Sequence, residues 1–125
     1  MSDSTTRPGV LVVDDDPQVR DLLGLALPRL GFTAWLAAGG EEALALFRRH
    51  REVISVALLD VRMSGLDGPA TLRALRGVDP ALRCCFMTGE AGGRAEAELL
   101  ALGAEAVLYK PFSLAELRRL LTAPG

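Results

Sequence analysis

The sequence predicts an α/β fold, a doubly wound five-stranded parallel sheet with helices on both faces. Short apolar runs alternate five times with segments of helical periodicity, a pattern typical of parallel sheets with right-handed crossovers. The run from Val56 to Leu59 is wholly apolar and is followed by a carboxylate and a glycine-containing loop, like a strand buried on both faces. Four of the five runs end on polar residues. These observations place the chemistry of the chain at one edge of the sheet.

The composition fits one domain. The chain has 125 residues, 50% of them hydrophobic, enough for a core without disulfides or a structural metal. A net charge of −2 gives no electrostatic reason to expect nucleic-acid contacts by this domain. No apolar run approaches the roughly 20 residues that cross a bilayer, and no leader precedes Val10. We therefore expect a cytoplasmic protein without membrane contact.

Turn and capping signals divide the chain into elements. The predicted strands lie at 10–13, 32–37, 53–60, 82–87 and 106–109. The predicted helices begin at Asp16-Pro17, Glu41-Glu42, Asp67, Ala91 and Ser113. The strand at 32–37 alternates poorly, which indicates an edge strand. The expected organisation is a flexible tail at 1–8, a domain at 9–122, and a tail or linker stub at 123–125.

Local signals also predict how the helices start and stop. Asp16 is expected to cap the first helix, with Pro17 at its first position. Gly77 is predicted to end the third helix. Ser113 and Glu116 have the spacing of a capping box. The buried stripe of the last helix is predicted to comprise Leu114, Leu117, Leu120 and Leu121.

Five strands in the order 2-1-3-4-5, the flavodoxin-like arrangement, would put the switch point of the sheet between strands one and three. Asp14 and Asp15 follow the first strand, and Asp60 ends the third. Thr88 and Lys110 follow the fourth and fifth strands. Each signal alone is weak, because acidic residues after a strand are usually caps or turns. Their joint placement predicts one polar site.

Three carboxylates in one cleft repel each other unless a cation joins them. One histidine and no suitably spaced cysteines make zinc implausible. Mg²⁺, or Mn²⁺ in its place, suits oxygen ligands and keeps positions open for water and phosphate. Such an ion beside a lysine and a hydroxyl donor indicates phosphoryl transfer onto Asp60.

The chain resembles the receiver domains of bacterial two-component response regulators over residues 10 to about 121. The resemblance rests on five motifs: Val-Asp-Asp-Asp at 13–16, Leu-Leu-Asp-Val-Arg-Met at 58–63, Leu-Asp-Gly at 66–68, Met-Thr-Gly at 87–89 and Lys-Pro-Phe at 110–112. It implies a phosphoacceptor signalling module rather than an enzyme acting on outside substrates. Such a module assists its own phosphorylation and dephosphorylation and switches protein–protein interactions.

The resemblance also implies roles for single residues. Asp60 would accept a phosphoryl group from the phosphohistidine of a sensor histidine kinase or phosphotransfer protein. The implied metal ligands are Asp14, Asp15, Asp60 and the backbone carbonyl of Arg62. Lys110 and Thr88 would contact the phosphate, and Gly89 would leave room for the loop nearby. The bond between Lys110 and Pro111 would be cis. The kinase would use the first helix and the loops around Asp60, and a homodimer would form through residues 91–121.

Three positions depart from the family pattern or stand out within it. Ser64 replaces the usual proline, so the loop after Asp60 is expected to be more mobile. Val107 replaces an aromatic residue that usually reports phosphorylation, and Tyr109 is expected on the same strand face. Arg62 and Glu90 flank the expected phosphate site. Either they pair across its mouth and slow hydrolysis, or they are exposed side chains whose pairing contributes about 0–1 kcal/mol.

Two other functions stay open from the residues alone. Asp14 and Asp16 have the spacing of the nucleophile and general acid of a haloacid-dehalogenase-like phosphatase. Pro17 and the position of Asp60 count against that assignment. The other alternative is a pseudo-receiver that acts as a scaffold without phosphorylation, against which the acid pair, Thr88 and Lys110 count.

Overall fold

The computed structural model describes residues 7–89 and 93–122. Five strands and five helices alternate along this part of the chain. The strands are β1 (Gly9–Val13), β2 (Thr33–Ala37), β3 (Ile54–Asp60), β4 (Arg83–Thr88) and β5 (Ala106–Tyr109). The helices are α1 (Pro17–Arg29), α2 (Gly40–His50), α3 (Gly68–Val78), α4 (Gly93–Ala101) and α5 (Leu114–Thr122). Residues 1–6 of the expected tail at 1–8, the expected stub at 123–125 and residues 90–92 lie outside the described residues.

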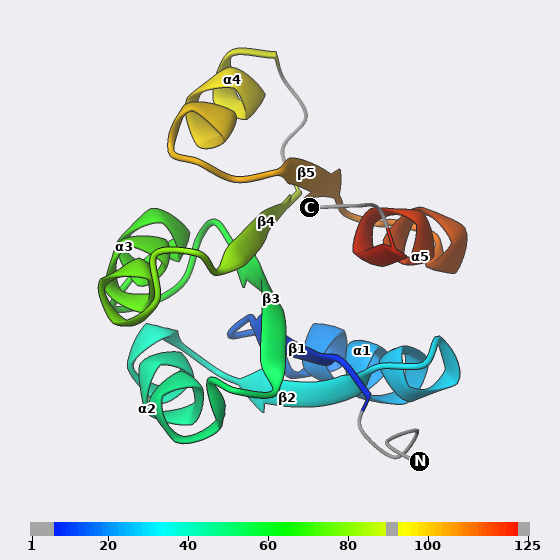
Figure 1. Ribbon diagram of the computed structural model, residues 1–125. Helices are drawn as coiled ribbons and strands as arrows, with labels where there is room; N and C mark the ends of the chain where they lie inside the picture. The colour runs from blue at the N-terminus through cyan, green and yellow to red at the C-terminus, as the bar shows by residue number, and fades with distance from the viewer. Residues whose placement is uncertain (1–6, 90–92, 123–125) are drawn as a thin grey trace.

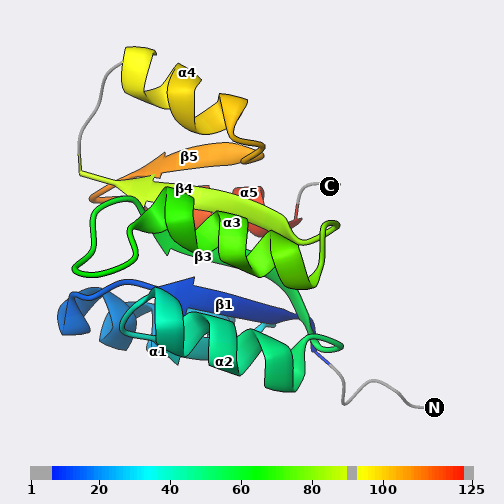
Figure 2. The ribbon, with the colours of Figure 1, turned by 90° about the vertical axis from the view of Figure 1, so that its left-hand side faces the viewer.

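All five strands are parallel and lie in the order β2-β1-β3-β4-β5, which confirms the predicted topology. β2 is an edge strand, as its poor alternation indicated. Helices α1 and α5 cover one face of the sheet, and α2, α3 and α4 cover the other (Figure 1). In Figure 2 the arrowheads of the strands point the same way, so their carboxyl ends share one edge.

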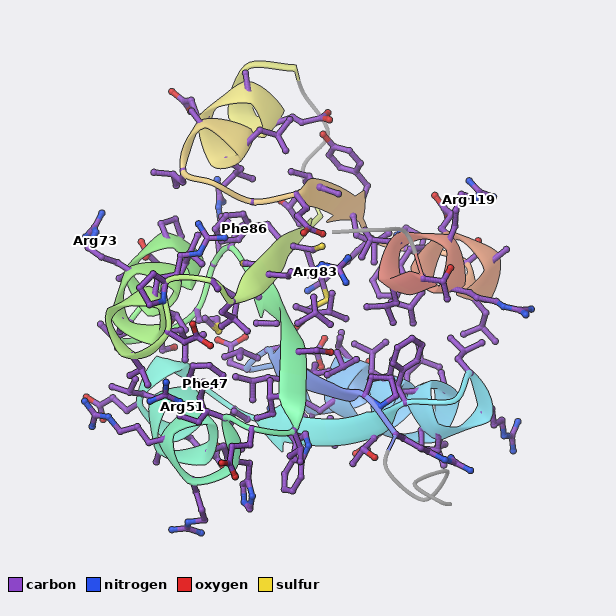
Figure 3. The ribbon with its side chains drawn as sticks, in the orientation of Figure 1. Phe47, Arg51, Arg73, Arg83, Phe86 and Arg119 are labelled. Atoms are coloured by element: carbon purple, nitrogen blue, oxygen red, sulfur yellow. The ribbon has the colours of Figure 1, made fainter. Side chains whose placement is uncertain are left out.

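Two hydrophobic layers fill the spaces between the sheet and its helices. The layer under α2 and α3 contains Phe47 and Phe86, both fully buried, whereas Arg73 and Arg119 point away from the core (Figure 3). The layer under α1 and α5 contains Leu23, Leu27 and Leu117. With β1, β3 and β4 buried on both faces, the residues that end these strands are held on a rigid scaffold.

The prediction that Gly77 ends the third helix is wrong. Gly77 lies inside α3, which continues to Val78. Asp79 is the residue that leaves the helical conformation, at φ −143° and ψ 102°, while its N–H still donates to the Leu75 carbonyl. Pro80 follows it, and a proline disfavours helical geometry in the residue before it. The proline therefore sets the end of this helix.

The last helix confirms its capping box and corrects its predicted stripe. The Ser113 N–H donates to the Glu116 carboxylate at 2.9 Å, and the Glu116 N–H donates to the Ser113 hydroxyl at 3.0 Å. Leu117 and Leu121 are buried, but Leu114 is 51% exposed. Leu114 is the first residue of α5, so it does not join the buried stripe. Among the helices of the described residues, none combines the length and the apolar character that spanning a membrane would need.

Candidate functional site

Asp14 directly follows β1, and its side chain is fully buried. One carboxylate oxygen, Oδ1, accepts from the Asp16 N–H at 2.9 Å. The backbone N–H of Asp14 donates to the Ala37 carbonyl of β2 at 3.1 Å. Asp16 in turn caps α1, because its carboxylate accepts from the Gln18 N–H at 2.9 Å, as the sequence predicted. The turn after β1 thus holds Asp14 at the sheet edge.

Asp60 ends β3 at the centre of the sheet and is 8% exposed. The next residue, Val61, donates its N–H to the Met87 carbonyl of β4 at 3.0 Å and accepts from the Gly68 N–H at 2.9 Å. Gly68 begins α3, and a Cβ built on it would lie only 2.5 Å from the Asp60 carbonyl oxygen. Only a glycine lets the helix come this close to the backbone of Asp60.

Lys110 follows the edge strand β5 and contacts both buried carboxylates. Its ammonium Nζ donates to Asp14 Oδ2 at 2.8 Å and to Asp60 Oδ1 at 3.2 Å. Its backbone N–H donates to the Thr88 carbonyl at 2.8 Å, which ties the end of β5 to the end of β4. The peptide bond between Lys110 and Pro111 is cis, the isomer that the resemblance implies. Side chains from three strand ends therefore meet at one point.

Burial and charge shape the protonation of this cluster. Burial raises the pKa of Asp60, and the charge of Asp14 raises it further, while Lys110 opposes both effects. Burial alone would lower the pKa of Lys110, but the hydrogen bond and charge of Asp14, followed by those of Asp60, raise it overall. Lys110 thus stays cationic, and its single charge does not fully compensate the carboxylates around it.

Asp15 completes a possible set of cation ligands. Asp14, Asp15 and Asp60 each offer a carboxylate oxygen, and these oxygens lie within 4.8 Å of one another. With all groups ionised, three carboxylates and one ammonium leave two negative charges, which a divalent cation would neutralise. Hard oxygen donors on a partly open edge fit Mg²⁺, which keeps several waters. The acidic cluster is thus able to hold the predicted metal.

The other predicted site residues lie around this cluster with different degrees of contact. Thr88 ends β4 and is 7% exposed, and Gly89 follows it. Val107 is half-buried against the layer under α2 and α3. Tyr109 donates its hydroxyl to the Glu96 carboxylate of α4 at 2.5 Å. Glu90 lies outside the described residues, so the predicted pairing with Arg62 stays a prediction.

Two contacts at the site were missed by sequence reasoning. The Arg20 guanidinium of α1 donates to the Asp14 carbonyl at 2.7 Å. The Ser64 N–H donates to Asp15 Oδ2 at 3.3 Å. Arg20 lies one helical turn after the Asp16 cap. This spacing was the sequence signal that its side chain could reach back to the turn after β1. No sequence signal indicated the Ser64 contact, since it depends on the path of a loop.

Known proteins share both the sequence pattern and the fold. The family described as the response regulator receiver domain matches residues 10–122. The transcriptional regulatory protein ZraR of Salmonella typhimurium is 36% identical over 112 residues, which are 90% of this chain and 25% of ZraR. This chain spans about half the length of several further transcriptional regulators that it matches.

Solved structures agree with the family match. The chemotaxis protein CheY4 of Vibrio cholerae superposes with a TM-score of 0.84 at 30% identity, covering 92% of this chain and 96% of that one. A chain of the CheX-CheY-BeF3-Mg+2 complex from Borrelia burgdorferi gives a TM-score of 0.84 at 26% identity, covering 94% of this chain and 90% of that one. The chain belongs to the response regulator receiver domain family.

Proposed function

We propose that this receiver domain accepts a phosphoryl group on Asp60, in a Mg²⁺-dependent reaction, and that the modification switches its protein–protein interactions. The donor is the phosphohistidine of a sensor histidine kinase or phosphotransfer protein. The observation that carries the proposal is the Lys110 ammonium, which bridges Asp14 and Asp60 beside a third carboxylate. This arrangement supplies a nucleophile, ligands for a cation and a fixed positive charge at one sheet edge.

In the transfer step an oxygen of the Asp60 carboxylate attacks the phosphorus. A P–O bond forms while the P–N bond to histidine breaks, and its electron pair returns to the ring nitrogen. Lys110 faces the oxygens of the transferred group, and the Thr88 hydroxyl donates a hydrogen bond to one of them. The protein's contribution is positioning and charge stabilisation, as in other phosphoryl transfers.

Asp14, Asp15, Asp60 and the backbone carbonyl of Arg62 would hold the cation. Bound Mg²⁺, or Mn²⁺ in its place, neutralises charge on the transferring phosphoryl oxygens. The uncompensated carboxylates at the site support this assignment, as does the Borrelia burgdorferi complex, which contains BeF3 and Mg²⁺. Without a cation, the net charge of two negative on the three carboxylates and Lys110 would repel the incoming phosphoryl group.

The interacting partners are proposed from the family and the fold. Receiver domains of response regulators interact with histidine kinases or phosphotransfer proteins, and we propose that such a protein docks at α1 and the loops around Asp60. The face formed by α4, β5 and α5, within residues 91–121, is the proposed output surface and the site of a homodimer. In the described residues Tyr109 and Glu96 connect β5 to α4 within this face.

The phosphatase alternative is less well supported. Asp16, its general acid, is occupied as the cap of α1, whereas Asp60 is buried beside Lys110. The two functions differ in which carboxylate is phosphorylated, and mass spectrometry distinguishes them.

The test is incubation with acetyl phosphate, with and without Mg²⁺, followed by intact-mass measurement. We expect a Mg²⁺-dependent, acid-labile gain of one phosphoryl group in the wild type and none in Asp60→Asn. A gain that persists in Asp60→Asn but is lost in Asp14→Asn would support the phosphatase instead. A wild type that gains no mass, and that also fails to bind beryllofluoride, would support the scaffold that acts without phosphorylation.

A further inference from the structure

We propose that the backbone N–H of Ser64 is a positioning group for the metal site, because it orients the Asp15 carboxylate before the cation binds. The proposal rests on the proposed function and adds a residue to its machinery. The observation is the hydrogen bond from the Ser64 N–H to Asp15 Oδ2 at 3.3 Å. It joins the loop between β3 and α3 to the turn after β1, across the edge where the acids gather.

The three carboxylates are not held equally. Asp14 and Asp60 are buried and share the Lys110 ammonium. Asp15 is exposed, and within the described part of the chain its carboxylate accepts one hydrogen bond, from Ser64. An exposed side chain without a partner samples several rotamers, and fixing it costs free energy. The orientation of the third ligand therefore depends on this amide.

The loop that carries Ser64 is itself held in place. Its base is closed by the hydrogen bond from the Gly68 N–H to the Val61 carbonyl at 2.9 Å. Asp67 caps α3 by accepting from the Ala70 N–H at 2.9 Å. Gly65 has a φ of +75°, a conformation that glycine adopts without strain and that turns the chain at the tip of the loop. The Ser64 N–H thus lies in a turn whose base is closed by backbone hydrogen bonding and by the cap of α3.

One side of the loop also packs against a neighbouring turn. A Cβ on Gly40, the first residue of α2, would lie 2.7 Å from Leu66 Cβ, so the two turns are in close contact. Leu66 contacts the Gly40 turn, and Ser64 of the same loop reaches Asp15. The expectation of a more mobile loop at Ser64 stays a prediction. A proline at this position has no N–H and could not make the contact.

A carboxylate has two oxygens, so accepting the Ser64 N–H at Oδ2 leaves Oδ1 for a cation. The amide carries no negative charge of its own and adds no repulsion to the acidic cluster. One hydrogen bond to an exposed carboxylate corresponds to a change of about three- to tenfold in an equilibrium constant. Loss of the N–H should weaken Mg²⁺ binding by that factor.

Two substitutions at one position isolate the N–H. Ser64→Ala removes the hydroxyl and keeps the amide, whereas Ser64→Pro removes the amide proton. The Mg²⁺ dissociation constant is measured by titration calorimetry on the full chain. We expect Ser64→Ala to match the wild type and Ser64→Pro to bind about three- to tenfold more weakly, with both variants folded by circular dichroism. Equal Mg²⁺ affinities in folded Ser64→Pro and Ser64→Ala would overturn the proposal.

A second measurement does not depend on the proline variant. Hydrogen exchange of the Ser64 amide in the metal-free wild type is compared with that in Asp15→Ala, which lacks the acceptor. We expect exchange at Ser64 to be about three- to tenfold faster in Asp15→Ala, and an unchanged rate would overturn the contact. A wild type that binds no Mg²⁺ would overturn the proposed function and, with it, any role of Ser64 at a metal site.

Discussion

Gly68→Ala tests whether the close approach of α3 to Asp60 sets the geometry of the site. The new methyl carbon would lie 2.5 Å from the Asp60 carbonyl oxygen and 2.9 Å from Val61 Cα. Ordinary contacts begin at 3.4 Å, so the start of the helix and the end of β3 must separate by about 0.9 Å. Both neighbours are backbone atoms and cannot rotate away. The substitution therefore moves the strand end that carries Asp60.

The expected cost of this overpacking is about 1–3 kcal/mol of unfolding free energy. With 125 residues and an unfolding entropy of about 2.1 cal/mol/K per residue, each kcal/mol lowers Tm by roughly 4 °C. We therefore expect Tm to fall by roughly 4–12 °C in a calorimetric or circular-dichroism melt. Phosphorylation of Asp60 by acetyl phosphate should slow by about tenfold or more in the folded variant, since a displacement near 1 Å can cost about a hundredfold.

Gly77→Ala is the matched control on the same helix. A Cβ at Gly77 would meet no described atom within 4 Å, and the residue lies inside α3. Here the same substitution should stabilise the protein by about 0.5–1 kcal/mol, because alanine favours a helix interior over glycine. The phosphorylation rate should not change. Equal Tm values for the two variants, or normal labelling of Gly68→Ala, would refute the reasoning.

Three further predictions concern the charges at the site. Because the pKa of Asp60 is raised in the folded protein, its ionisation lowers stability once the pH exceeds the ordinary value of 3.8. In metal-free urea titrations Asp60→Asn should thus be more stable than the wild type at pH 7. This advantage should vanish below about pH 4. An advantage that persists at acid pH would show that the ionisation of Asp60 is not its cause. Lys110→Met should lower the unfolding free energy by about 2–3 kcal/mol in urea titrations at pH 7, because Asp14 stays buried without the Lys110 ammonium. A change below about 1 kcal/mol would show that the bridge adds little to stability. Arg20→Ala should cost about 1–2 kcal/mol in thermal unfolding by leaving the Asp14 carbonyl without its donor, and recovery of part of this loss in Arg20→Lys would identify the hydrogen bond rather than helix propensity as the cause.

The parallel sheet and the edge at which the polar residues meet could be predicted from local patterns. Parallel strands joined by right-handed crossovers end at the same edge, so a polar residue after each apolar run is enough to place it. The bridge from Lys110 to Asp14 and Asp60 follows from that placement. Asp16 as a cap and the pair of Ser113 and Glu116 were predictable for a similar reason, because a cap involves residues close together in the chain.

Where the sequence prediction was wrong, two local signals competed. Gly77 is a common helix-ending residue, but the proline three positions later was the stronger constraint. Leu114 has the spacing of the buried stripe, but it is the first residue of α5 and is half exposed to solvent. Periodicity shows which positions can face the core, whereas the packing of the helix end decides which of them do.

The two neighbouring acids after β1 show what the sequence could not predict. The resemblance implies that both Asp14 and Asp15 are metal ligands, but it does not tell how each is held: Asp14 is fully buried and bridged by Lys110, while Asp15 is exposed. Consecutive side chains at a strand end point in different directions, so strand geometry can direct only one of them into the cleft. The second needs a partner from another loop, and the Ser64 N–H provides it. In this site the sheet fixes two of the three carboxylates, and the loop that carries Ser64 orients the third.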